Sequence, residues 1–250
     1  MRRISLLFAV VLLASAISGC VWICSAEMIE DAYHCPYSST PITVDGKLNE
    51  PVWERAKTIS FVIPVSLAEP ISKTEARIAY DKDFLYVAFK AYDDDICGIL
   101  TKRDSATCQE DALEIFLKTD PEKEPYFDFE INALGTVYDS YVEKRDSTDG
   151  DRCWSGWNCA GLKIASDVKG TINKMAVKDE YWILEVAIPF AELPALGGKH
   201  PVKGDTWLFN LARCNNSCLH LPEDNELSAS APLSKLNFHR YEDWNKLIFD

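Results

Sequence analysis

A short run at residues 108–117, CQEDALEIFL, gathers carboxylates at the start of an apolar segment. Glu110 and Asp111 stand at its entrance, and the alternation that follows places Glu114 on the face opposite the aliphatic side chains. Such carboxylates accept hydrogen bonds from sugar hydroxyls or coordinate a divalent cation, and the same pattern is typical of a solvated strand edge. The thiol of Cys108, at the head of the run, fits none of these roles directly.

Aromatic residues with polar neighbours form a second candidate surface. CWSGWNC at residues 153–159 presents Trp154 and Trp157 in one loop, and Phe238 precedes a histidine and an arginine. Aromatic rings stack on the apolar CH faces of sugars, while carboxylate, amide and guanidinium groups bond the hydroxyls. For each of these three aromatics, anchoring in the core or in a loop is the alternative.

The sequence gives no specific support for catalysis. GxSxG and HExxH motifs do not occur, and the four histidines are spread along the chain. Acidic pairs are expected by chance among 39 acidic residues. The formal net charge of −13 repels phosphate backbones, which argues against nucleic-acid partners. A binding protein that is not an enzyme is therefore favoured.

Nine cysteines indicate an exported protein with disulfides. If Cys20 carries a lipid, eight remain, which allow 105 pairings; the local pairs Cys153–Cys159 and Cys214–Cys218 are the simplest, and Cys97 is a candidate partner for Cys108. Cys214-x3-Cys218-x-His220 is an alternative metal spacing, but it lacks the paired CxxC of strong zinc sites, so disulfides or free thiols are favoured. Three aspartates at 93–95 suggest calcium, although a solvated turn is the more usual explanation.

The first residues have the features of an export signal. Arg2 and Arg3 precede an apolar stretch too short for a comfortable membrane span, and ISGC follows, ending at Cys20. Small residues before a cysteine resemble the bacterial lipobox, in which the thiol is lipidated; an ordinary secretory signal is the alternative. We expect a signal peptide at 1–19, a tether at 20–40 and one domain at 41–250, anchored to the outer membrane or cell surface.

Short, closely spaced strands dominate the rest of the chain. Two-residue alternation and turn signals predict strands at 74–80, 84–92, 112–118, 126–133, 136–142, 161–168, 170–177, 181–189, 206–214 and 246–249. One short helical turn is expected after Asn49 as its cap, and another at Phe190–Leu193. The pattern predicts an all-β fold, an antiparallel β-sandwich of immunoglobulin or jelly-roll type.

Four stretches together resemble carbohydrate-binding module family 9 and its exported relatives. They are PITVDGKLNEPVWERA (41–56), FLYVAFKAYDDDI (84–96), LTKRDSATCQEDALEIFL (100–117) and YFDFEINALGTVYDSYV (126–142). NFHRYEDWNKLIF (237–249) is similar to the family's closing strand region. The resemblance implies a β-sandwich that binds sugars, holds structural calcium in some members and often accompanies glycoside hydrolases.

The resemblance also implies the residues of a site. Family members hold a sugar between two tryptophans, with carboxylate and amide side chains around its hydroxyls. Phe238 aligns with one tryptophan, Cys108 stands at the position of the other, and Ser230 replaces the tryptophan of a later motif. Glu114 and Asn132 match polar family positions. The expected ligand contacts are Glu114, Asp111, Asn132, Phe238, Trp154, Trp157 and Arg103.

The leading hypothesis is a lipid-anchored, non-catalytic protein that binds a polysaccharide or oligosaccharide at the cell surface and supports glycan breakdown by partner hydrolases. Because Cys108 and Ser230 depart from the sugar clamp, a structural or partner-binding sandwich without sugar binding is the first alternative. The many cysteines make a haem- or redox-binding sandwich the second.

Overall fold

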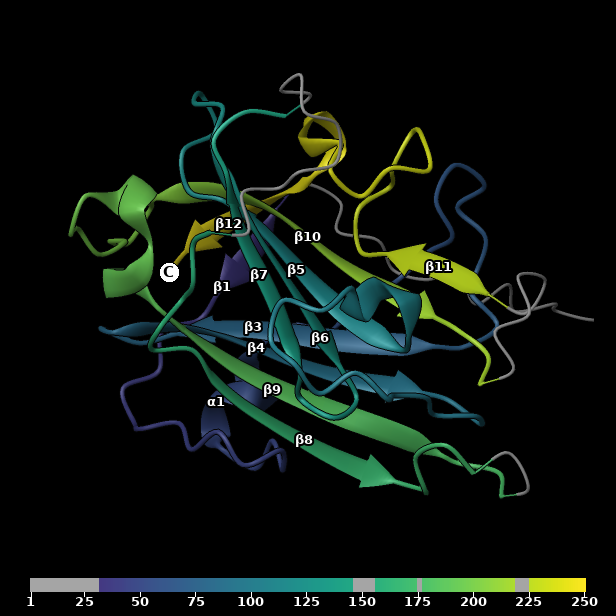
Figure 1. Ribbon diagram of the computed structural model, residues 1–250. Helices are drawn as coiled ribbons and strands as arrows, with labels where there is room; N and C mark the ends of the chain where they lie inside the picture. Colours follow the sequence, from purple (N-terminus) through teal and green to yellow (C-terminus); the bar gives the residue numbers. More distant parts are fainter. Residues whose placement is uncertain (1–31, 146–155, 175–176, 219–224) are drawn as a thin grey trace, which may run out of the picture.

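The computed structural model describes residues 32–145, 156–174, 177–218 and 225–250. Within these ranges the chain folds into two packed β-sheets with a few short helical turns (Figure 1). The predicted β-sandwich is confirmed. The signal peptide at 1–19 and the lipidation site at Cys20 lie outside the described residues.

The larger sheet has seven described strands. In spatial order they are β1 (Tyr33–Cys35), β12 (Asn245–Phe249), β10 (Thr206–Asn215), β5 (Ala112–Lys118), β6 (Tyr126–Asn132) and β7 (Val137–Val142), with β11 (Glu226–Ala229) paired to β10. All neighbours are antiparallel except β1 and β12, which run parallel. The folded unit therefore includes Tyr33–Cys35, inside the segment expected to be a tether.

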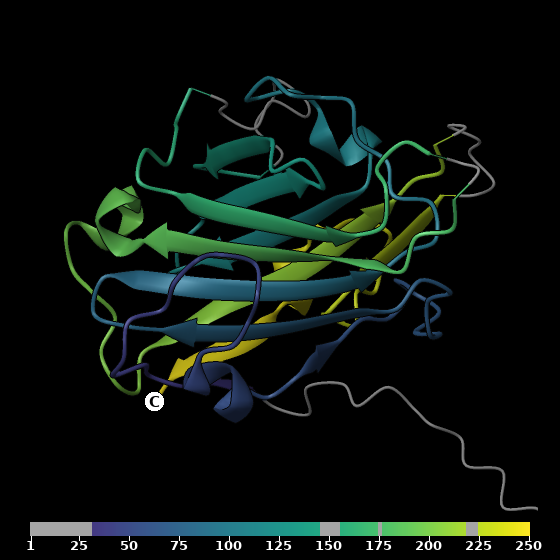
Figure 2. The same cartoon turned by 90° about the horizontal axis from the view of Figure 1, so that it is seen from below.

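The smaller sheet is fully antiparallel and has five described strands. Their order is β2 (Ile59–Ser60), β3 (Thr74–Tyr80), β4 (Phe84–Tyr92), β9 (Tyr181–Pro189) and β8 (Lys163–Lys169). Figure 2, seen from below, shows the long strands β3, β4, β9 and β8 side by side across the front of the molecule. The β3–β4 hairpin is closed by Asp81, whose Oδ1 accepts the backbone N–H of Asp83 and of Phe84, each at 2.8 Å.

The helical elements are short. They are α1 (Pro51–Arg55), η1 (Thr107–Gln109), η2 (Phe190–Glu192), η3 (Pro194–Leu196) and η5 (Tyr241–Asp243). α1 lies on the outer face of the smaller sheet, where Val52 and Trp53 are buried (Figure 1). Its N-cap is Glu50 rather than the predicted Asn49. No helix in the described ranges is long and apolar enough to cross a membrane.

One predicted strand, at 170–177, is wrong where the structure describes it. Residues 170–174 form turns, because their polar groups bond to a neighbouring loop instead of a strand. Asn173 exchanges two hydrogen bonds with the backbone of Gly98, at 2.7 and 3.0 Å. The N–H of Thr171 donates to Asp179 Oδ1 at 2.6 Å. These local bonds replace the ladder that a strand would need.

The hydrophobic core lies between the two sheets. Leu113, Ile115 and Leu117 of β5 are buried there, as the alternation predicted, beside alternate aromatic residues of β6. Successive side chains of a strand point to opposite faces. Because Leu113, Ile115 and Leu117 face the core, Glu114 and Phe116 face outward from the larger sheet. Packing between the sheets therefore positions the polar face.

Candidate functional site

The outer face of the larger sheet is the candidate site. Strand register places on it Glu114 and Phe116 of β5; Tyr126, Asp128 and Glu130 of β6; Tyr138 and Ser140 of β7; and Asn210, Ala212 and Cys214 of β10. The face has two parts, which we call the aromatic half (Phe116, Tyr126, Phe238 and Trp244) and the acidic half (Glu114, Asp128 and Glu130). They meet along β5 and β6.

The aromatic half forms where the C-terminal segment folds over the sheet. Phe116 packs against the rings of Phe238 and Trp244, with centroid distances of 6.3 and 5.5 Å. The indole N–H of Trp244 donates to the carbonyl of Phe238 at 2.8 Å, which fixes the loop. Tyr126 Oη lies 2.9 Å from His239 Nδ1. Phe238 is half-buried, so part of its ring remains open to a ligand.

The acidic half brings three carboxylates into one small space. Oxygens of Glu114, Asp128 and Glu130 all lie within 4.8 Å of one another. Glu114 and Glu130 stand directly opposite each other on neighbouring strands, an arrangement that destabilises a sheet when both are charged. Burial, and then the proximity of Glu130, raise the pKa of Glu114 to about 8, and burial raises the pKa of Glu130 as well. Burial and the second carboxylate therefore both disfavour the charged form of Glu114.

Neighbouring groups hold two of these carboxylates in place. The Cys214 thiol donates to Glu114 Oε1 at 3.1 Å. Glu130 Oε2 accepts from Thr107 Oγ1 and from the backbone N–H of Cys108, each at 3.2 Å. η1 thus fixes Glu130 and leaves Cys108 exposed at the rim.

Sequence reasoning missed Asp128, Glu130 and Cys214 as members of this face. The alternation in YFDFEIN already separated the two acids from the core residues. Only the pairing of β6 with β5 brings them beside Glu114.

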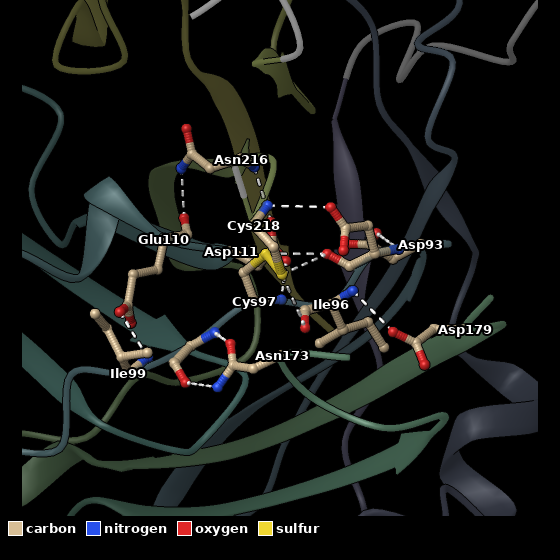
Figure 3. Close-up of a disulfide and its surroundings, with 12 residues drawn as sticks. Asp93, Ile96, Cys97, Ile99, Glu110, Asp111, Asn173, Asp179, Asn216 and Cys218 are labelled. Atoms are coloured by element: carbon tan, nitrogen blue, oxygen red, sulfur yellow. Dashed lines mark hydrogen bonds between the residues drawn. A yellow bond between two sulfur atoms is a disulfide. The ribbon is translucent and has the colours of Figure 1, made fainter. Parts of the chain in front are cut away.

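Two predicted ligand residues, Asp111 and Asn132, bond to groups of the protein itself. Both are fully buried. Asp111 accepts the backbone N–H of Cys97 at 2.6 Å and of Asn216 at 2.8 Å (Figure 3). The Asn132 amide donates to Glu110 Oε2 and to the carbonyl of Leu100, each at 2.9 Å. The entrance to β5 is therefore an internal hydrogen-bond network that anchors the preceding loop, and this geometry favours a structural role for both residues.

A disulfide between Cys97 and Cys218 joins that loop to the end of β10 (Figure 3). The predicted pairs Cys97–Cys108 and Cys214–Cys218 are wrong, because Cys108 and Cys214 are free thiols. Cys214 lies on the strand and points to the outer face, whereas Cys218 follows the strand and reaches the loop. Cys159 is also free, and its suggested partner Cys153 lies outside the described residues, as does His220 of the alternative metal spacing.

Arg103 and Trp157 do not join the candidate site. The Arg103 guanidinium donates to both carboxylate oxygens of buried Asp139 at 2.5 Å and to Asn158 Oδ1 at 2.7 Å. Trp157 packs against the core ring of Phe127, with centroids 5.2 Å apart. Both residues therefore close an edge of the core. Trp154 lies outside the described residues.

The aspartates at 93–95 do not share a cation site. Asp93 pairs with buried Arg213 at 2.7 Å, and Asp94 pairs with Lys178 at 2.9 Å. Oδ2 of Asp95 accepts the N–H of Cys218 at 3.1 Å. Three carboxylates with three separate partners do not provide the converging oxygens that calcium needs.

Ser230 has a structural role. It stands where the resemblance places a tryptophan. It is 2% exposed, and its hydroxyl accepts the N–H of Leu211 at 2.9 Å. The hydroxyl also lies 3.3 Å from Asn210 Oδ1. These bonds tie the segment after β11 to β10, so Ser230 offers no stacking surface.

Two packed sheets with an aromatic and acidic outer face are the architecture of a β-sandwich binding module. Residues 44–218 match the model of the family described as carbohydrate family 9 binding domain-like. The chain belongs to this family, in agreement with the resemblance seen in the sequence.

Three solved structures share the fold. A candidate carbohydrate-binding protein from Bacteroides uniformis ATCC 8492 is 14% identical, with a TM-score of 0.66 over 88% of this chain and 99% of that one. A family 9 carbohydrate binding module from Caldicellulosiruptor kristjanssonii in complex with glucose is 14% identical, with a TM-score of 0.57 over 87% of this chain and 94% of that one. Its complex with cellotriose is 13% identical, with a TM-score of 0.59 over 87% and 93%. A search of curated proteins finds no match.

Proposed function

We propose that this protein binds carbohydrate without catalysis, on the outer face of the larger sheet where the aromatic and acidic halves meet. The observation that carries the proposal is the placement of a partly open aromatic ring, Phe238, over the same face as Glu114 and Glu130, in a member of family 9. The fold neighbour solved with glucose and with cellotriose supports sugars as the ligand class.

The chemistry of the face suits a sugar. The ring of Phe238 offers an apolar surface for the CH groups of a pyranose. Glu130 is half-buried, and protein donors hold its Oε2, so its second oxygen is the one that would accept a sugar hydroxyl. Cys108 at the rim adds no second ring, so we expect a one-sided platform with weaker affinity than a two-ring clamp.

Calorimetric titration of the folded protein with glucose and cellotriose tests the proposal. We expect binding, weakened about tenfold by Phe238→Ala through loss of stacking. Tyr37→Ala is the matched control, because Tyr37 is an exposed aromatic (41%) bridged to Tyr80 at the smaller sheet. Absence of binding to these sugars and to an array of polysaccharides, by protein shown to be folded, would refute the proposal.

The cell-surface role is part of the proposal. The positive first residues, the short apolar stretch and ISGC before Cys20 support a lipid anchor on the outer membrane or cell surface. Glycoside hydrolases acting on the same glycan are the partners we propose. Metabolic labelling with a clickable palmitate, compared between the native chain and Cys20→Ala, tests the anchor; equal labelling of both would exclude it.

A partner-binding sandwich without sugar binding is the second candidate. It is favoured by the exposed thiol of Cys108 where the resemblance places a stacking tryptophan, and by Glu114, which is only 3% exposed. In this case Phe238→Ala and Glu130→Gln would leave every measured interaction unchanged.

A further inference from the structure

A cavity of about 370 Å³ lies between two loops and shares no lining residue with the outer face of the larger sheet. Because Leu208 of β10 stands opposite Lys118 of β5, the loop that leaves β5 meets the loop that enters β10. Residues of the segments 119–123 and 195–207 line the space between them. Its volume falls within the range of small-molecule sites, roughly 300–1,000 Å³, and is sufficient for one sugar residue.

The wall on the β10 side is anchored in the fold. Trp207 is buried and packs against the core ring of Phe190, with centroids 6.0 Å apart. The ring of His200 packs against the same phenylalanine, at a centroid distance of 5.9 Å. The N–H of Gly204 donates to the carbonyl of Phe249 at 2.7 Å, which ties the loop to the last strand. The cavity is therefore formed before any ligand binds.

The acids of this cavity are engaged by the protein, whereas one of its cations is not. Asp120 pairs with Lys123 at 3.0 Å. Oδ2 of Asp205 accepts the N–H of Val202 at 2.9 Å. The amine of Lys199 lines the same space and forms no ion pair with any described residue. A positive charge is therefore available to a ligand.

A second observation points to a hydrogen-bond acceptor at the same place. Thr119, the first residue after β5, lines the cavity and is 9% exposed. Its hydroxyl is buried and has no hydrogen-bond partner in the part of the chain that the structure describes. Buried hydroxyls are rarely left without a partner. An ammonium and a hydroxyl that can both donate, beside acids that are already held, favour a negatively charged ligand.

We propose that this cavity binds the carboxylate of an acidic sugar, with Lys199 as its ion-pair partner and Thr119 as a hydrogen-bond donor. The carboxylate follows from the cavity, and the choice of a sugar to carry it rests on the proposed function. Charge-assisted hydrogen bonds are about twice as strong as neutral ones, so the carboxylate dominates recognition. Because the formal net charge of the chain is −13, most of its surface repels an anion, and the cation at this cavity gives selectivity.

Titration of the folded protein with glucuronate, glucose and acetate, followed by amide NMR signals, tests the inference. Glucuronate and glucose differ only at C6, so their difference in affinity isolates the carboxylate. We expect glucuronate to shift the signals of segments 119–123 and 195–207, with an affinity roughly 10-fold above that of glucose at this cavity. Acetate measures the carboxylate alone, and acetate binding as tight as that of glucuronate would overturn the assignment to a sugar.

Three variants locate the contacts. Lys199→Met keeps the aliphatic stem and should weaken glucuronate binding roughly 10-fold. Thr119→Val keeps the shape and should weaken it roughly 3-fold. Lys203→Met is the matched control, because Lys203 is an exposed lysine of the same loop that does not line the cavity, and we expect unchanged affinity. Equal effects of Lys199→Met and Lys203→Met would overturn the proposal, because general surface charge would then explain the binding.

The same measurements separate this cavity from the outer face. Phe238→Ala should weaken binding of cellotriose and leave the glucuronate shifts in place, whereas Lys199→Met should leave affinity for cellotriose unchanged. Absence of glucuronate shifts in the two segments, or equal affinity for glucuronate and glucose there, would overturn this inference whether or not cellotriose binds. Urea unfolding confirms that each variant is folded.

Discussion

Removing the Cys97–Cys218 disulfide should destabilise the protein more than loss of any free thiol. The bond closes a chain segment with a sequence separation of 121. The loop-closure relation assigns about 5 kcal/mol to a loop of this length, and native disulfides generally contribute about 2–5 kcal/mol. We therefore expect Cys97→Ala/Cys218→Ala to lower the free energy of unfolding by about 3–5 kcal/mol.

Urea unfolding measures this effect. With an m value of about 2–3 kcal/mol/M, the midpoint should fall by roughly 1–2.5 M. Reductant should shift the native protein by the same amount and leave the double variant unchanged. Cys108→Ser, which removes an exposed free thiol, should change stability by less than about 0.5 kcal/mol. A double variant as stable as this control would refute the reasoning, because the loop ends would then be held without the bond.

Three further predictions concern buried polar groups. Arg213→Met should lower the free energy of unfolding in urea by about 3–5 kcal/mol, because buried Asp93 loses its charged partner. Adding Asp93→Asn should recover part of the loss. If the two losses are simply additive, the direct pairing is contradicted. Asn132→Ala should cost about 1–3 kcal/mol, because Glu110 loses a donor, yet leave affinity for cellotriose unchanged; selective loss of affinity would restore Asn132 as a ligand contact. Burial raises the pKa of Glu185, so its contribution to stability is fully present below about pH 4 and is lost as pH rises through the folded pKa. Unfolding of Glu185→Gln should lack that part of the pH dependence, and identical pH profiles would contradict it.

Local sequence was sufficient for most of the strands. Thr74–Tyr80 and Phe84–Tyr92 have the predicted bounds, because two-residue alternation between turn signals depends only on nearby residues. The same alternation assigned Glu114 to the outer face of its strand. It failed at 170–174, where hydrogen bonds of Asn173 to Gly98, distant in sequence, and of Thr171 to the nearby Asp179 compete with strand pairing.

By itself, the sequence determined the β-sandwich class, the family and the face on which Glu114 stands. Only the tertiary structure decided which groups meet there. The register of β5 against β6 sets Glu130 opposite Glu114, and β7 brings Ser140 to the edge of the cluster. The loop that contains Cys97 approaches the end of β10, so Cys97 pairs with Cys218 and not with a cysteine closer in sequence. Side-chain periodicity is a local property, whereas register and loop approach depend on how the whole core packs, so neither can be obtained from spacing along the chain.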